Sequence, residues 1–223
     1  MSVHYLLAVL LLSVLLCPAP AVALDPAPGR LLVARQGLKD PRFQKTVILL
    51  LRHDEQGSVG LILNRPTRFS LARSFPQFDK VFSGLRGALW LGGPVSSRSA
   101  LVLLESDSPP PGSRPVFGRV HVTGVRQLVL WLQADHRQER FRVYAGSAGW
   151  APGQLEAELR RGDWDVAPAT EETIFGRNPH RQWQQEQDVR PLLIRRSPEP
   201  GSEGNPALFG VGADNHRGLV EAG

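Results

Sequence analysis

The side chains that could carry chemistry in this sequence are few and lie far apart along the chain. His53-Asp54-Glu55 places titratable groups together at one turn, where an imidazole base and a carboxylate that orients it could meet. Arg65 could reach an anion, because a guanidinium matches the geometry of carboxylates and phosphates. Trp150 could stack a ligand through its ring. The candidate ligand or partner surface therefore consists of His53, Arg65, Trp150 and Gln154.

A purely structural interpretation competes with each of these functional ones. Solvated turn residues account for His53 and its acidic neighbours, since turns lie at the surface. Asn64 and Arg65 end an apolar run just before Pro66, where Asn makes local turn hydrogen bonds. A Trp that precedes a helix usually packs at the edge of the core, so packing is the favoured role of Trp150.

Common catalytic and metal-binding signatures are absent from the sequence. Ser147 lies in Ala-Gly-Ser-Ala-Gly, which lacks the spacing of a nucleophile elbow. Gly92-Gly93-Pro94 lacks the Lys and the Ser or Thr of a phosphate-binding loop and favours a tight strand exit. The histidines show no ligand spacing, and Glu156 and Glu158, two residues apart on a predicted helix, point to different faces. No catalytic residue, cofactor or metal ion is therefore predicted.

Residues 1–23 have the features of a cleaved export signal. Residues 5–16 are apolar apart from Ser13, in a run too short to cross a membrane as a helix, and Ala21-Val22-Ala23 suits signal peptidase. Cleavage there would remove Cys17, the only cysteine, and with it any disulfide or thiolate. We therefore expect a periplasmic or otherwise exported protein with no transmembrane span in the mature chain. The n-region has no Lys or Arg, which leaves open a cytoplasmic protein with a misassigned N-terminus.

The formal charge of +5 comes mainly from arginine, because Lys39, Lys45 and Lys80 are the only lysines. Such a balance permits attraction to nucleic acid, anionic lipid or acidic polysaccharide. The arginines are dispersed, however, and no helix-turn-helix, zinc finger or aromatic-studded basic strand accompanies them. Specific binding of nucleic acid is therefore not predicted, least of all for an exported protein.

Apolar patterning predicts a series of short strands and helices. Residues 46–51 and 59–63 are apolar runs around a turn at 53–57, which predicts a buried β-hairpin. Alternation or apolar runs predict further strands at 30–34, 88–91, 100–104, 116–123 and 140–146, and residues 164–168 are expected to be extended. Helical spacing, caps and glycines predict helices at 71–75, at 125–132 with Thr123 as its cap, from Pro152 to Gly162, and at 171–175 after Thr170.

A set of motifs in this order resembles the YqgE/AlgH family. The motifs are Leu32-Val-Ala34, Leu38-Lys-Asp-Pro-Arg-Phe43, Gly60-Leu-Ile-Leu-Asn-Arg-Pro66, Gly92-Gly-Pro-Val95, and Tyr144-Ala-Gly146 with Gly149-Trp-Ala-Pro-Gly-Gln-Leu155. The resemblance covers about Arg30 to Trp183 and implies a single compact α+β domain, with a bifurcated or partly barrel-like mixed sheet surrounded by helices. It implies no known reaction, because the family is largely uncharacterised; one branch is linked to regulation of alginate synthesis and is often labelled a transcriptional regulator.

The sequence therefore divides into a signal peptide at 1–23, a YqgE/AlgH-like domain at 24–196 and a tail at 197–223 whose Gly, Pro and small polar residues predict disorder. We expect a non-enzymatic binding or regulatory protein that is exported and whose partner is an envelope protein or an anionic molecule. Two alternatives stay open: a cytoplasmic regulator related to transcription, and an enzyme whose catalytic residues are dispersed around His53, Arg65 and Trp150.

Overall fold

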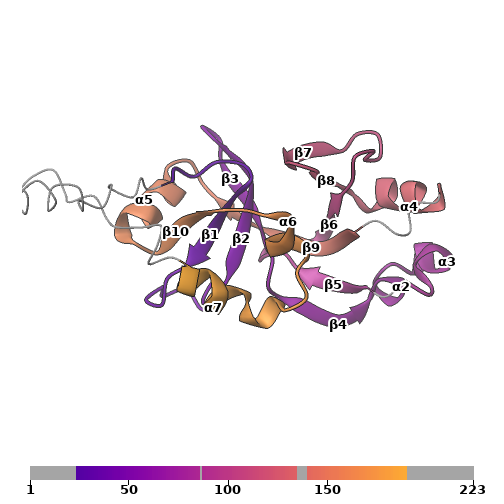
Figure 1. The fold of residues 1–223 in the computed structure, drawn as a ribbon, viewed down its shortest axis with the longest axis horizontal. Helices are drawn as coiled ribbons and strands as arrows, with labels where there is room; N and C mark the ends of the chain where they lie inside the picture. Colours follow the sequence, from indigo (N-terminus) through magenta and orange to yellow (C-terminus); the bar gives the residue numbers. More distant parts are fainter. Residues whose placement is uncertain (1–23, 86, 135–139, 190–223) are drawn as a thin grey trace, which may run out of the picture.

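Strand β9 (Arg140–Trp150) is shared by two branches of one sheet in the computed structural model (Figure 1). Its last residues pair antiparallel with β3 (Gly57–Ile62), and its middle residues pair parallel with β5 (Ala88–Leu91). Its opposite edge pairs antiparallel with β6 (Val95–Glu105). The neighbour of β9 on one side thus changes from β5 to β3 along its length, and this produces the bifurcated sheet that the family resemblance implies.

The first branch is an antiparallel sheet in the order β10 (Trp164–Pro168), β1 (Arg30–Ala34), β2 (Val47–Asp54), β3. The β2–β3 pairing confirms the predicted hairpin. Most of the apolar side chains of these strands are buried in one large core cluster. Helices α5 (Gln154–Arg161) and α7 (Pro179–Val189) pack on this branch, and the Trp183 indole donates to the carbonyl oxygen of Ala34 at 2.6 Å.

The second branch extends from β9 towards the opposite end of the molecule (Figure 1). Its strands are β4 (Pro66–Ser70), which pairs with β5, and β8 (Val120–Gly124), which pairs with β6 and with β7 (Arg114–Phe117). Its helices are α2 (Leu71–Ser74), the 3-10 helix η1 (Pro76–Phe78), α3 (Asp79–Phe82) and α4 (Val125–Gln133). A separate core cluster of buried residues lies between these helices and the sheet. Helix α6 (Glu171–Phe175) contacts β9.

Three local predictions are wrong. Residues 116–123 are not one strand, because the chain turns at Gly118, with a φ of +48°, and forms the β7–β8 hairpin. Thr123 belongs to β8, and no side chain caps α4. Strand β9 does not end at Gly146 but continues to Trp150, because β3 replaces β5 as its neighbour there.

Gly92 and Gly93 lie where β5 ends between β3 and β9. The backbone N–H of Gly92 donates to Ala145 at 2.8 Å, and its carbonyl oxygen accepts from Ile62 at 2.9 Å. A Cβ at Gly93, whose φ is +153°, would lie 2.2 Å from the carbonyl carbon of Ser147. The two glycines therefore let three strands approach closely, which agrees with the predicted tight strand exit.

Tyr144, on β9, gives the protein a pH-dependent stability at high pH. It is fully buried, and its burial raises the pKa of the hydroxyl from 10.0 to about 12, although Arg142 beside it opposes part of this rise. Because the pKa is higher in the folded state, Tyr144 stabilises the fold fully below pH 10, and this contribution disappears as the pH rises through 12.

We therefore expect the free energy of unfolding of the wild type to fall by roughly 2 kcal/mol more than that of Tyr144→Phe as the pH is raised from about 9 to about 12. Urea unfolding at intervals across this range measures the difference. Parallel pH profiles for the two proteins would contradict this account of Tyr144.

The structure describes residues 24–85, 87–134 and 140–189. Within these ranges no helix is long and apolar enough to cross a membrane. The predicted signal peptide at 1–23 and the predicted tail at 197–223 lie outside the described residues.

Candidate functional site

Three aromatic rings from separate elements meet at the end of the first branch. Phe43 comes from the loop between β1 and β2, Trp150 ends β9 and Trp164 begins β10. Phe43 stacks on Trp150 with ring centroids 6.2 Å apart, and Trp164 meets both rings edge-on at 5.9 Å. Both tryptophans are almost completely buried, with 5% and 3% of their surface exposed. The three rings form a rigid aromatic cluster.

Glu158, on α5, holds the two tryptophans in place. One of its carboxylate oxygens accepts the indole N–H groups of Trp150 and Trp164, each at 2.8 Å. The other oxygen accepts the side-chain amide of Gln154 at 2.9 Å, and Gln154 in turn accepts the backbone N–H of Ala151 at 3.0 Å. One carboxylate thus fixes the start of α5 and the orientation of both indoles.

The loop that carries Phe43 is ordered by Asp40. Its carboxylate accepts the backbone N–H of Arg42 at 2.9 Å and pairs with the Arg42 guanidinium at 2.7 Å. Hydrogen bonds from this guanidinium lower the pKa of Asp40, although slight burial opposes them. Farther along the loop, the Thr46 hydroxyl donates to the carbonyl oxygen of Phe43 at 2.7 Å. These bonds hold Phe43 against the tryptophans.

A cavity of about 650 Å³ opens beside the aromatic cluster, between this loop, α5 and the start of β6. Its volume is typical of sites that bind small ligands or single side chains of a partner. Charged residues of both signs surround it: the Asp40–Arg42 pair, the Arg161–Asp163 pair at 2.6 Å, and Lys39. Val95 adds an apolar side chain that is 46% exposed. We call this the aromatic cavity.

The carboxylates that line the aromatic cavity are all engaged by other groups. The Glu158 carboxylate already accepts N–H groups on both oxygens, and Asp40 and Asp163 are each held by an arginine. No Ser, Thr, Cys, His or Tyr occurs among its described lining residues. Among these lining residues the carboxylates are thus all engaged, and Lys39 is the side chain whose amine could act as a nucleophile or base. Across the described ranges, no three His, Cys, Asp or Glu residues lie close enough together to hold a metal ion.

Two of the four predicted surface residues line this cavity. They are Trp150, which is almost completely buried, and Gln154. The burial of Trp150 agrees with the packing role that the sequence favours. Glu156 and Glu158 point to different faces of α5, as their spacing predicts, since Glu158 meets the tryptophans and Glu156 meets His53.

His53 and Arg65 lie outside the aromatic cavity. Nδ1 of His53 is 2.8 Å from the Ser58 hydroxyl and its Nε2 is 3.7 Å from Glu156, so neither of its acidic turn neighbours orients it. Burial lowers the pKa of Arg65, whose guanidinium donates to the carbonyl oxygen of Gln44 at 3.4 Å. Of the three residues that one alternative joined in a catalytic centre, only Trp150 therefore lines the aromatic cavity.

Sequence reasoning missed Phe43, Glu158 and Trp164 as members of the site. The i, i+4 spacing of Gln154 and Glu158 on a predicted helix indicates that these two side chains meet. Nothing local indicates that Trp164 lies beside Trp150, because the two strands that carry them are not neighbours in the sheet.

The amino-acid sequence of this chain is similar to those of several known proteins. Residues 31–188 match the family model described as AlgH-like, DUF179. The UPF0301 protein SCO2948 of Streptomyces coelicolor is 39% identical over 162 residues, covering 70% of this chain and 83% of the relative. The UPF0301 protein GOX1459 of Gluconobacter oxydans is 37% identical over 183 residues, covering 76% of this chain and 95% of the relative.

Two solved structures share the fold. The crystal structure of protein DIP2367 from Corynebacterium diphtheriae has a TM-score of 0.65 and 25% identity, and the match covers 78% of this chain and 95% of that one. The solution structure of the AlgH protein from Pseudomonas aeruginosa has a TM-score of 0.61 and 26% identity, and covers 77% and 94%. These likenesses confirm both the expected fold class and the resemblance read from the motifs.

Proposed function

The chain belongs to the AlgH-like family, and from that premise we propose that it is a non-catalytic binding protein whose aromatic cavity receives an apolar side chain of a partner protein. Family membership assigns no reaction, so the proposal rests on the cavity itself. The observation that carries it is the pair of buried tryptophans fixed by Glu158, with every carboxylate of the cavity already engaged.

The charges around the cavity favour a protein partner over a simple anion. Asp40 and Arg42 neutralise each other, as do Arg161 and Asp163, so the rim has no strong excess of one sign. An aromatic centre within a polar rim of mixed charge is the usual anatomy of a protein interface, where Trp and Arg dominate the binding energy. A partner that inserts an aromatic or long aliphatic side chain would meet both features.

We also propose that the protein is exported. Its partner would then be a protein of the cell envelope. Export is supported by the apolar run at 5–16 and the Ala21-Val22-Ala23 triplet. Fractionation of the protein in its own host, with the intact mass of the product, tests it. A mature chain that starts near Leu24 outside the cytoplasm is the expected result, and a cytoplasmic product that starts elsewhere would contradict it.

A photo-crosslinking residue at Val95, on the cavity rim, tests the binding role directly. We expect it to capture a partner that the same residue at Leu130 does not capture, because Leu130 is 61% exposed on α4 and lies outside the cavity. With the purified partner, Val95→Glu should raise the dissociation constant by about tenfold or more and Leu130→Glu should leave it unchanged. Equal effects of the two substitutions, or chemical conversion of the captured partner, would overturn the proposal.

A further inference from the structure

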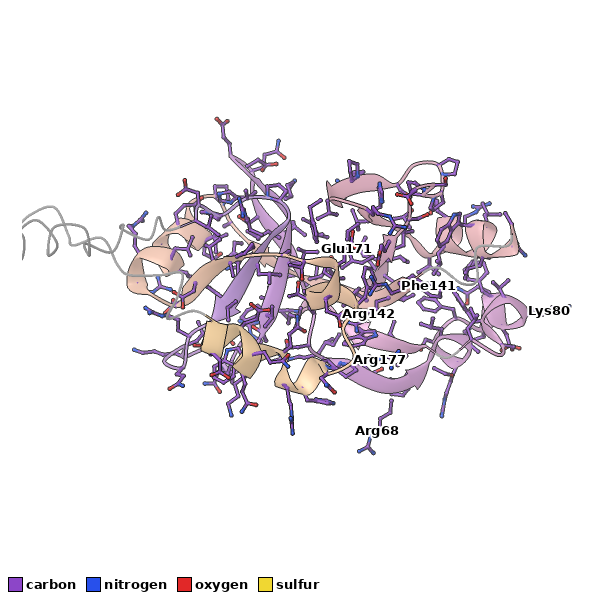
Figure 2. The ribbon with its side chains drawn as sticks, viewed as in Figure 1. Arg68, Lys80, Phe141, Arg142, Glu171 and Arg177 are labelled. Atoms are coloured by element: carbon purple, nitrogen blue, oxygen red, sulfur yellow. The ribbon has the colours of Figure 1, made fainter. Side chains whose placement is uncertain are left out.

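A second cavity, of about 400 Å³, lies in the other branch, where β5 begins beside β9. Its lining includes the aromatic rings of Trp90, Phe141 and Phe175 and the side chains of Leu71 and Leu85. Two arginines of β9, Arg140 and Arg142, also line it. Figure 2 shows Arg142 and Phe141 in the middle of the molecule, near α6. We call this the arginine cavity.

Arg142 is held rigidly in this cavity. The central carbon of its guanidinium lies 4.0 Å from the centre of the Trp90 ring, in a cation–π contact. Its two terminal nitrogens donate to the backbone carbonyl oxygens of Ile174 and Gly176, at the end of α6. The Tyr144 hydroxyl is a further partner. A guanidinium carries five N–H donors, so donors remain for another acceptor.

Arg142 also differs from the arginines around it in its counter-charges. Arg140 pairs with Glu105 at 2.5 Å and with Glu172 at 3.6 Å, and Arg119 also pairs with Glu105. Among the described residues no carboxylate lies within ion-pair distance of Arg142, although Glu172 attracts it from farther away. A half-buried cation that faces an indole ring, two carbonyl oxygens and the Tyr144 hydroxyl, with no carboxylate at ion-pair distance, is suited to receive an anion.

We propose that the arginine cavity binds a small organic anion, a carboxylate carried on a flat apolar group. The carboxylate would accept N–H groups from Arg142, because the planar guanidinium matches its two oxygens. The flat group would lie against the aromatic and leucine walls, where it leaves water. The site is separate from the aromatic cavity, so its failure would leave the proposed partner binding untouched.

Titration calorimetry of the full-length protein with 2-naphthoate tests this assignment. We expect a dissociation constant below about 1 mM for the wild type. Arg142→Met removes the charge but keeps a long side chain, and it should weaken binding about tenfold or more. Arg68→Met is the matched control, since Arg68 is exposed on β4 and extends away from the domain at its lower edge (Figure 2). It should bind like the wild type.

A second variant separates ligand binding from folding, because Arg142 also ties α6 to β9. Ala88→Leu adds bulk to the cavity wall without removing Arg142, and it should also weaken 2-naphthoate binding about tenfold. If Arg142→Met fails to fold, Ala88→Leu decides the question.

Two further ligands test the chemical class. The neutral analogue 2-naphthalenemethanol and inorganic phosphate should each bind at least about tenfold more weakly than 2-naphthoate. Equal binding of the alcohol would show that the charge does not matter, and equal binding of phosphate would show that the apolar walls do not. Either result, or no binding of 2-naphthoate by the wild type, would overturn the proposal.

Discussion

Replacement of Gly93 by alanine is expected to destabilise the protein by at least about 4 kcal/mol or to prevent its folding. The added Cβ would lie 2.2 Å from the carbonyl carbon of Ser147, 2.3 Å from its oxygen and 2.4 Å from the nitrogen of Ala148. All three are backbone atoms of β9, so no side-chain rotation can relieve the clash. The φ of +153° is itself unfavourable for alanine. The end of β5 would have to separate from β9 at the point where the sheet divides.

Urea unfolding followed by tryptophan fluorescence measures this loss, with Gly37→Ala as the matched control. A Cβ at Gly37 would meet nothing within 4 Å, and its φ is not positive, so the control should change the free energy of unfolding by less than about 0.5 kcal/mol. If the two alanine variants were equally stable, the close approach of β5 and β9 would be wrong. Gly93→Ala should also disturb the aromatic cavity, because the next two residues, Pro94 and Val95, line it.

Glu158→Ala should cost about 3 kcal/mol of stability and abolish binding in the aromatic cavity. The substitution leaves the indole N–H groups of Trp150 and Trp164 without their acceptor while both rings stay buried, and each buried donor without a partner costs about 1–3 kcal/mol. The rings also lose the bond that sets their orientation. Denaturant unfolding gives the stability, and the affinity for the partner captured at Val95 gives the binding.

Two further substitutions serve as controls for Glu158→Ala. Glu156→Ala removes a carboxylate from the same helix that is 41% exposed and lies 3.7 Å from His53, so we expect a loss below about 0.5 kcal/mol and unchanged partner binding. Glu158→Gln keeps an oxygen that can accept both indoles and should lose only about 1 kcal/mol. If Glu158→Ala were as mild as Glu156→Ala, Glu158 would not be what holds the cavity together.

The predictions for Gly93 and Glu158 concern residues whose local structure the sequence predicts but whose contacts with distant residues it does not. The sequence of Gly92-Gly93-Pro94 predicts the sharp end of a strand, because those residue types break a regular strand. The sequence does not predict that Gly93 lies against the backbone of Ser147, since the two residues are 54 positions apart in the chain. Glu158 stands on a correctly predicted helix, and its separation from Glu156 onto another face follows from helical geometry.

The sequence by itself determined the elements whose burial pattern is local. The apolar runs of β2 and β3 around a polar turn predict the hairpin, Gly162 in the left-handed conformation ends α5, and the Thr170 capping box begins α6. The family motifs added the fold class, and the comparisons confirm it. In each case the deciding interactions lie within a few residues, so the residue types alone specify them.

Only the tertiary structure decided which elements become neighbours. It extended β9 to Trp150 by pairing it with β3, brought Trp164 beside Trp150, and gave His53 a partner on α5 instead of its own turn. It also buried Arg142 against Trp90. The physical reason is that periodicity shows which face of a segment is buried but not against what. The partner is chosen by packing of the whole chain, and here that choice creates both cavities.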